Sequence, residues 1–362
     1  MNLFLQNMFY MPAMVEWSGN RCCYDCIYCF VENSSKYKAN SPVEIVNQLK
    51  NPTGLAGQAI KLGYPLLFSN RTDPFAECNM PATRIIAKMT ACMANGVIWQ
   101  TKTGSEKDIE HVLNEYAKAG KKNAIFAITL NTLDDAKRWQ IEPKAPSTKH
   151  RLKIAKMIRE AGLGVMANVA PMHNGIVPEG EFSAFVGKLL EHFDTAHSCA
   201  FHISRRAYKK RELELAKAGI DTPSGDGMIE AARQAERLHP RFTLTDGTSE
   251  VLYDYYKSKL GKIGIHYGCF MERLRKIPSG QQVRKEDFIE PFAEAYPDII
   301  DRDMRMREWV CLQDLNLYKR WDVQRIRTLR QLLSWLYANP FMVFSPYCNG
   351  LTRIENEKFY KL

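Results

Sequence analysis

The chain has 362 residues, enough for one barrel-sized domain plus a smaller appendage, and its 45% hydrophobic content predicts a substantial buried core. It shows no cationic-then-apolar leader and no run of about 18 apolar residues, so we expect a soluble, cytoplasmic protein without membrane contact. Ten cysteines in such a chain indicate a reducing compartment, and the formal charge of +10 favours polyanionic partners such as nucleic acid.

The first feature along the chain is a cysteine-rich loop that follows an extended, mainly apolar segment over residues 8–17. In this loop Cys22, Cys26 and Cys29 have the spacing CxxxCxxC, which lets three thiolates converge on one small metal object. A four-iron cluster held by three cysteines keeps one iron without a protein ligand, and that iron can chelate a small molecule. Zinc sites also use closely spaced thiolates but usually as two CxxC-type pairs, and no second pair follows downstream.

After the loop, apolar segments of strand and helix type alternate about every 30 residues. The predicted strands are 64–69, 97–101, 124–130, 164–170 and 200–204, and the predicted helices are 41–50, 81–95, 108–119, 147–161 and 181–193. Together with the segment before the cysteine loop this gives six strands. The pattern predicts a right-handed series of parallel β-α units, and six such units make a partial (β/α)6 TIM-like barrel that is open on one side. Chemistry in such folds lies at the carboxyl ends of the strands, where the cysteine loop is expected.

The cysteine loop, with Tyr28 directly before its last cysteine, resembles the signature of the radical S-adenosylmethionine (SAM) enzymes. Four further segments are similar to the radical SAM subfamily that includes spore photoproduct lyase: Thr72-Asp73-Pro74, the strand leading to Lys102, Thr129–Asn131 with Ile141-Glu142-Pro143 after it, and residues 162–171. The likeness covers roughly residues 10 to 205. It implies a partial barrel over residues 1–204, a [4Fe-4S] cluster on the three cysteines, and SAM as second cofactor.

Binding of SAM needs hydrogen-bonding side chains at successive strand ends, because SAM presents an amino group, a carboxylate, a ribose and an adenine. Polar residues follow the predicted strands at the required places, although such residues can also be plain turn formers. The predicted SAM contacts are Tyr28, Ser69, Asn70, Asp73, Thr101, Lys102, Thr129, Asn131 and Asn168.

Beyond Ser204 the alternation is lost, and we expect residues 205–362 to form a mainly helical extension that covers the barrel and the substrate site. The densest basic run is interpreted either as a phosphate-contacting segment or as a solvated helix face, and it contains Arg205, Arg206, Lys209, Lys210 and Arg211. Residues 222–227 predict a loop and residues 322–337 an amphipathic helix. Cys269, Cys311 and Cys348 lack the spacing of a ligand set, and their role stays open between a hydrogen donor and a second cluster.

The leading hypothesis is a radical SAM enzyme of lyase or isomerase type that acts on a nucleic-acid base. It would cleave SAM reductively to a 5′-deoxyadenosyl radical and abstract hydrogen from a thymine-derived nucleotide in DNA, with electrons from a donor such as flavodoxin or ferredoxin. The lyase has a hydrogen-donating cysteine at the end of its fourth strand, and Thr129-Leu130-Asn131 contains none. Base modification or rearrangement, as in phage DNA hypermodification, therefore fits better than repair.

Two alternatives remain open. One is a radical SAM enzyme acting on a peptide or small metabolite, which scattered rather than clustered basic residues would favour. The other is a zinc-stabilised nucleic-acid-binding protein without catalysis.

Overall fold

The computed structural model describes most of the first 260 residues and short pieces of the remainder. The described residues are 3–5, 13–15, 22–29, 31, 41–52, 60, 65–68, 72–201, 203, 205–220, 224–244, 250–260, 278, 281–283, 352–355 and 358–361. The predictions for Ser69 and Asn70, the helix over residues 322–337 and the three late cysteines lie outside the described residues.

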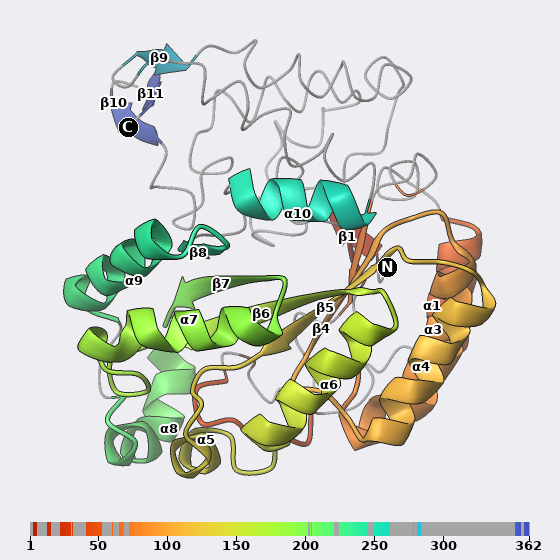
Figure 1. The fold of residues 1–362 in the computed structure, drawn as a ribbon, viewed down its shortest axis with the longest axis horizontal. Helices are drawn as coiled ribbons and strands as arrows, with labels where there is room; N and C mark the ends of the chain where they lie inside the picture. The colour runs from red at the N-terminus through yellow and green to blue at the C-terminus, as the bar shows by residue number, and fades with distance from the viewer. Residues whose placement is uncertain are drawn as a thin grey trace.

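The centre of the fold is one sheet whose strands follow each other in chain order (Figure 1). Its strands are β1 (Leu3–Leu5), β2 (Ala13–Val15), β3 (Leu66–Phe68), β4 (Val97–Thr101), β5 (Ala124–Thr129), β6 (Gly164–Met172), β7 (Thr195–Ala200) and β8 (Phe242–Leu244). β1 is antiparallel to β2, and each later neighbouring pair is parallel. No pairing between described residues joins β1 to β8, so the sheet is open. The predicted α/β partial barrel is confirmed.

Two details of the strand prediction are wrong. The sixth predicted strand, 200–204, lies earlier, at Thr195–Ala200, because this strand has polar side chains on one side and so lacks a continuous apolar run. The sheet also continues past Ser204, where β8 adds a further parallel strand after two helices. β8 was not predicted because it has only three residues and follows two helices, whereas the predicted pattern has one helix between successive strands.

Helices connect the parallel strands, and one further helix follows β8. They are α1 (Pro42–Lys50), α3 (Met80–Cys92), α4 (Glu106–Lys118), α5 (Asp135–Ile141), α6 (Thr148–Glu160), α7 (Phe182–His192), α8 (Arg205–Lys217), α9 (Asp226–Leu238) and α10 (Glu250–Leu260), with single 3-10 turns at Glu77–Asn79 and Glu179–Glu181. The predicted helices before residue 200 are confirmed. Ser41, Ser105 and Ser147 each cap one by accepting a backbone N–H, a contact worth about 1 kcal/mol.

The short helix α5 was not predicted, and the end of the chain contributes strands of its own. β9 (Gln282–Val283), β10 (Thr352–Glu355) and β11 (Lys358–Lys361) form a separate antiparallel sheet. The division into a barrel and a mainly helical extension stays a prediction. Among the described residues, no helix combines the length and the apolar character that crossing a membrane requires.

The register of the sheet separates an outer face, packed by helices, from an inner face. Phe68 and Trp99 stack on the outer face with ring centroids 4.6 Å apart, and Trp99 Nε1 donates a hydrogen bond of 3.0 Å to Tyr116 Oη of α4. On the inner face, Tyr256 Oη of α10 lies 3.7 Å from Met166 Sδ. A Cβ on Gly164, at the amino end of β6, would meet Tyr255 Oη at 2.7 Å. Helix α10 therefore occupies the inner face at the amino ends of the strands.

Candidate active site

The cysteine loop is fastened by hydrogen bonds to the segments that follow β4 and β5. Tyr24 Oη donates to the Thr103 carbonyl, and Ile27 N donates to the carbonyl of Ile141 at 3.0 Å. Lys144 N in turn donates to the carbonyl of Tyr24 at 3.3 Å. Because both segments lie beyond the carboxyl ends of their strands, the loop lies at the edge of the sheet where the sequence predicted it.

The three spaced cysteines differ in exposure. Cys26 is buried, Cys22 is partly buried, and Cys29 is exposed, as is the neighbouring Cys23. Burial, followed by the Asp73 carboxylate, raises the pKa of Cys22 to about 11. Burial raises the pKa of Cys26 to about 12, and the ammonium of Lys102 opposes the shift at both thiols. A positive charge therefore lies beside the thiols that would ligate an anionic cluster.

No three His, Cys, Asp or Glu side chains in the described part of the chain gather closely enough to hold a single metal ion. A four-iron cluster binds each of its cysteines through a different iron atom, so its ligand set has a wider spacing than that of one ion. Three thiols on one short loop, with a lysine ammonium beside two of them, are a donor set that fits such a cluster.

The buried carboxylate of Glu142 is hydrogen-bonded to Tyr28 of the cysteine loop. Its side chain is 1% exposed and pairs with Arg151, which is 0% exposed. The Tyr28 hydroxyl donates to Glu142 Oε1 and accepts a hydrogen bond of 2.9 Å from Asn131 Nδ2. Lys102 Nζ lies 4.0 Å from Glu142 Oε1 and 5.7 Å from the centroid of the Tyr28 ring. Burial disfavours the charged carboxylate, but Arg151 and then Lys102 offset this and hold the pKa of Glu142 below its ordinary value.

Sequence reasoning missed the role of Arg151. Its guanidinium also donates to the carbonyl of Thr129 at 2.9 Å and to that of Pro146 at 3.0 Å, so it ties α6 to the end of β5. Glu142 appeared only within the segment that carried the family resemblance. Arg151 is one of several basic residues on α6, and no spacing distinguishes it from the exposed ones.

Asp73 and Thr101 form a hydrogen-bonded connection between the segments after β3 and β4. The Asp73 carboxylate accepts from Thr101 Oγ1 at 2.6 Å, Lys102 N at 2.5 Å and Phe75 N at 2.9 Å. Thr101 belongs to the outer face, in register with Ile128 and two residues after Trp99. The bonds of both residues are structural, and their predicted contact with SAM stays a prediction.

The inner face carries a polar row at the carboxyl ends of the strands. Thr129, Asn168 and His197 are paired across β5, β6 and β7, so their side chains lie on the same side of the sheet. Asn168 Oδ1, His197 Nδ1 and Asn131 Oδ1 are enclosed and find no hydrogen-bond partner in the described structure. Each such group costs about 1–3 kcal/mol and calls for a missing partner. The row therefore offers hydrogen bonds to a polar ligand, as the site of SAM or a substrate requires.

The basic run is on α8, and one of its members contacts the cysteine loop. Arg211 pairs with Asp25 of the loop and with Glu214, both at 2.7 Å. Lys144 reaches the other oxygen of Asp25 at 3.5 Å. Lys209 and Lys210 are exposed, whereas the side chains of Arg205 and Arg206 lie outside the described part. Helix α8 is therefore beside the loop, but Arg211 is engaged in ion pairs.

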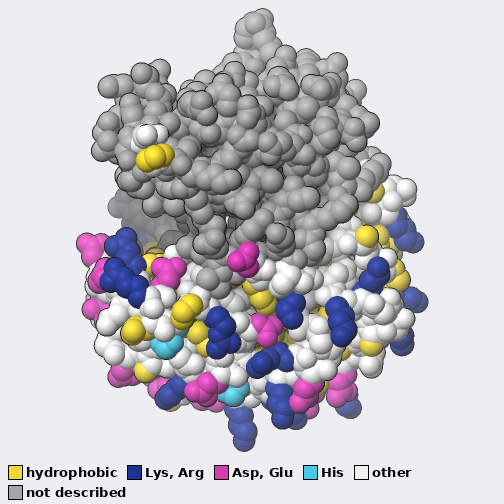
Figure 2. Space-filling model, turned by 45° about the horizontal axis from the view of Figure 1, so that its top comes forward, with side chains coloured by type: hydrophobic (Ala, Val, Ile, Leu, Met, Phe, Trp, Pro, Cys, Tyr) yellow, Lys and Arg dark blue, Asp and Glu magenta, His cyan; other side chains and the backbone are white. Residues whose placement is uncertain are grey.

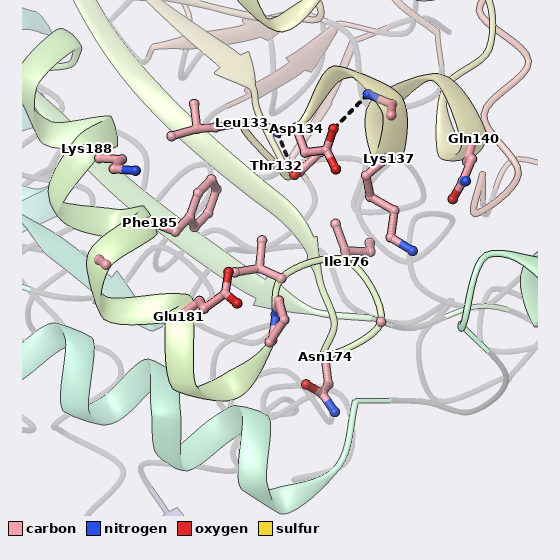
Figure 3. A pocket seen from close by; sticks show the side chains of 15 residues that line it. Thr132, Leu133, Asp134, Lys137, Gln140, Asn174, Ile176, Glu181, Phe185 and Lys188 are labelled. Atoms are coloured by element: carbon pink, nitrogen blue, oxygen red, sulfur yellow. Dashed lines mark hydrogen bonds between the residues drawn. The ribbon is translucent and has the colours of Figure 1, made fainter.

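A recess of about 790 Å³ lies next to the same strand ends, between α5, the segment Asn174–Pro178 and α7 (Figure 3). In Figure 3, Lys137 and Gln140 project from α5, while Phe185 comes from α7 and Glu181 from the 3-10 turn directly before it. Its lining carries both signs of charge, and it contains none of the predicted SAM contacts.

Figure 2 shows that basic and acidic side chains are interspersed over the described surface of one face. Ion pairs at the surface of the described residues include Arg84 with Asp108 at 2.7 Å and Lys153 with Glu106 at 2.7 Å. The positive net charge is not concentrated on the face in this view.

A family model and a viral relative match the amino-terminal part of the chain. The model of the radical SAM superfamily matches residues 18–181. A protein of Acidianus two-tailed virus described as uncharacterized protein ORF301 is 27% identical over 168 residues, which are 42% of this chain. These residues are 53% of the viral protein, so the chain spans about half of that relative's length.

Two solved structures are similar to parts of the chain. Spore photoproduct lyase complexed with dinucleoside spore photoproduct has a TM-score of 0.46 and 16% identity, covering 63% of this chain and 74% of the lyase. SuiB of Streptococcus suis bound to its precursor peptide SuiA has a TM-score of 0.44 and 13% identity, covering 70% of this chain and 52% of SuiB. The radical SAM superfamily uses a [4Fe-4S] cluster and SAM. Residues 18–181, which contain the CxxxCxxC loop and strands β3 to β6 of the open sheet, therefore match the radical SAM superfamily.

Proposed function

We propose that this radical SAM enzyme acts on a nucleic-acid base in DNA, most simply a thymine-derived nucleotide, and modifies or rearranges it. The observation that carries the proposal is the cysteine loop, bonded to the carboxyl edge of the sheet beside a row of enclosed polar groups without partners. When bound, the cluster and SAM supply a 5′-deoxyadenosyl radical that abstracts hydrogen from the substrate.

The chain's own residues have separable roles in this proposal. Cys22, Cys26 and Cys29 hold the cluster, and the Lys102 ammonium stabilises the negative charge of the thiolates beside it. The hydroxyl of Tyr28 is hydrogen-bonded to Glu142 and Asn131, and these bonds orient the Tyr28 ring within the cysteine loop. The amide of Asn131 offers a free oxygen to the bound cofactor.

DNA as substrate is supported by charge and by the place of α8. The chain carries a formal charge of +10, and its densest basic run is on the helix that contacts the cysteine loop through Arg211 and Asp25. The exposed ammonium groups of Lys209 and Lys210 are on the same helix and can neutralise phosphates near the site. A cytoplasmic location and a flavodoxin or ferredoxin as electron donor belong to the same proposal.

Anaerobic reconstitution with iron and sulfide, followed by reduction with SAM present, tests the radical chemistry. We expect a brown protein that releases 5′-deoxyadenosine, and deuterium transfer from labelled DNA to this product. The triple variant Cys22→Ala, Cys26→Ala, Cys29→Ala should lose both colour and product, whereas the exposed Cys92→Ala on α3 should keep both. A triple variant that remains brown and active refutes the assignment of the three ligands, and a colourless, zinc-loaded wild-type protein points to the structural zinc alternative.

A peptide or small metabolite is the second candidate, favoured by the interspersed charges of Figure 2 and by the recess of mixed polarity. Affinity for DNA measured at several salt concentrations separates the two. A DNA-modifying enzyme should lose affinity steeply as salt rises, because binding releases counterions from the phosphates. Failure to bind DNA even at low salt favours the second candidate.

A further inference from the structure

His197 is an inner-face residue to which the proposed radical chemistry gives no task. It lies on β7 directly across from Asn168 of β6, and neighbouring strands place such side chains about 4.8 Å apart. His197 Nδ1 and Asn168 Oδ1 are both enclosed, and neither has a hydrogen-bond partner within the described part of the chain. Because the two unsatisfied groups are neighbours, one ligand that forms a hydrogen bond to each of them explains both.

The charge state of the pair limits what this ligand can be. Burial lowers the pKa of His197 to about 4, so the imidazole is neutral at pH 7, and the Asn168 amide carries no charge. Among the described residues, the nearest strand end with a cation on this face is that of Lys102, which follows β4. It lies three strands from His197 and two from Asn168, or about 14 Å and about 10 Å along the sheet. A phosphate or carboxylate would find no counter-charge from the pair, whereas an uncharged edge with a donor next to an acceptor fits both atoms.

We propose that His197 and Asn168 bind the imide edge of the substrate base, with Asn168 Oδ1 accepting from the ring N–H and His197 Nδ1–H donating to the adjacent carbonyl. Side chains on paired positions of strands about 4.8 Å apart can converge on neighbouring atoms of one ring. Thymine and its derivatives carry this edge, because N3–H is flanked by two carbonyl groups. The assignment rests on the proposed nucleobase substrate and specifies how the site selects it. It gives Asn168, which the sequence predicted as a SAM contact, to the substrate instead.

The test measures binding to the reconstituted protein with SAM present and without reductant. The probes are two single-stranded oligonucleotides that differ only in one central base, thymine or N3-methylthymine. We expect wild type to bind the thymine probe about tenfold more tightly, because methylation removes the donor and blocks the edge. His197→Phe should abolish this preference. His197→Asn should restore part of it, because its amide nitrogen replaces Nδ1. The matched control is His192→Phe, an exposed substitution on α7, which should bind like wild type.

Retention of the preference by His197→Phe overturns the assignment, and so does a wild-type protein that binds both probes equally. An equal loss of SAM affinity in His197→Phe also overturns it, because the residue would then serve the cofactor. These results are independent of radical formation. A wild type that prefers the thymine probe yet releases no 5′-deoxyadenosine refutes the proposed radical chemistry and leaves the pair assigned. Release of 5′-deoxyadenosine without a preference refutes the pair alone.

Discussion

Replacing Arg151 by methionine should destabilise the domain more than any exposed charge substitution. The variant leaves Glu142 charged and 1% exposed, and it removes the donors to the carbonyls of Thr129 and Pro146. Breaking a buried pair from one side costs about 3–5 kcal/mol. Lys102, 4.0 Å from Glu142, replaces part of the lost attraction, so we expect the lower end of that range.

Urea unfolding of the apo protein at pH 7, followed by circular dichroism, measures the loss. The double variant Arg151→Met, Glu142→Gln removes both charges and should be less destabilised than the sum of the two single variants, by about 2 kcal/mol. Arg84→Met is the control, because Arg84 pairs with Asp108 while 52% exposed, and it should cost at most about 1 kcal/mol. An Arg151→Met protein within about 1 kcal/mol of wild type would refute the reasoning.

Two further predictions concern the inner face. The pKa of His197 is lowered from 6.5 to about 4 by burial, so the unfolded chain binds more protons than the folded one between these values. The free energy of unfolding should therefore fall on acidification below pH 6.5, by at most about 1.4 kcal/mol per pH unit. His197→Asn lacks this titration, and a difference from wild type that stays constant between pH 7.5 and 5 in urea unfolding contradicts the prediction. Gly164→Ala should cost about 1–3 kcal/mol, because the new Cβ would lie 2.7 Å from Tyr255 Oη and 2.9 Å from Ile125 Cγ1. Because Tyr255 Oη also donates to Asp194 at 3.2 Å, the clash is tested by comparing Gly164→Ala in the wild-type and Tyr255→Phe backgrounds. Gly164→Ala should lower the melting temperature less in the Tyr255→Phe background, and an equal loss would show that the hydroxyl is not the obstacle.

Local signals explain why much of the fold was predictable. Ser41 and Ser147 act over one helical turn, so their caps mark helix starts without knowledge of the tertiary structure. The cap at Ser105 was not recognised, and that helix was predicted to start at residue 108 instead of Glu106. Strands β4 and β5 read as apolar runs because both of their faces are covered. Strand β7 was misplaced because its inner side faces the site and carries His197.

The candidate site was predictable only where its residues are close in sequence. The CxxxCxxC spacing lies within eight residues, and its place at the carboxyl edge follows from the order of strand and loop. The support beneath it depends on contacts between distant residues, such as Tyr28 with Glu142 and Arg211 with Asp25. No sequence periodicity indicates such pairs. The basic run on α8 was therefore interpreted as available for phosphate contacts, although its Arg211 forms an ion pair with Asp25 of the cysteine loop.

The position of α10 has a consequence for the lifetime of reactive species. Tyr255 and Tyr256 fill the inner face where the strands begin, against Gly164 and Met166. A molecule bound beside Asn168 and His197 would therefore have these two tyrosines on the side that faces the amino ends of the strands. Shielding from water on that side would lengthen the lifetime of a reactive species formed on the bound molecule.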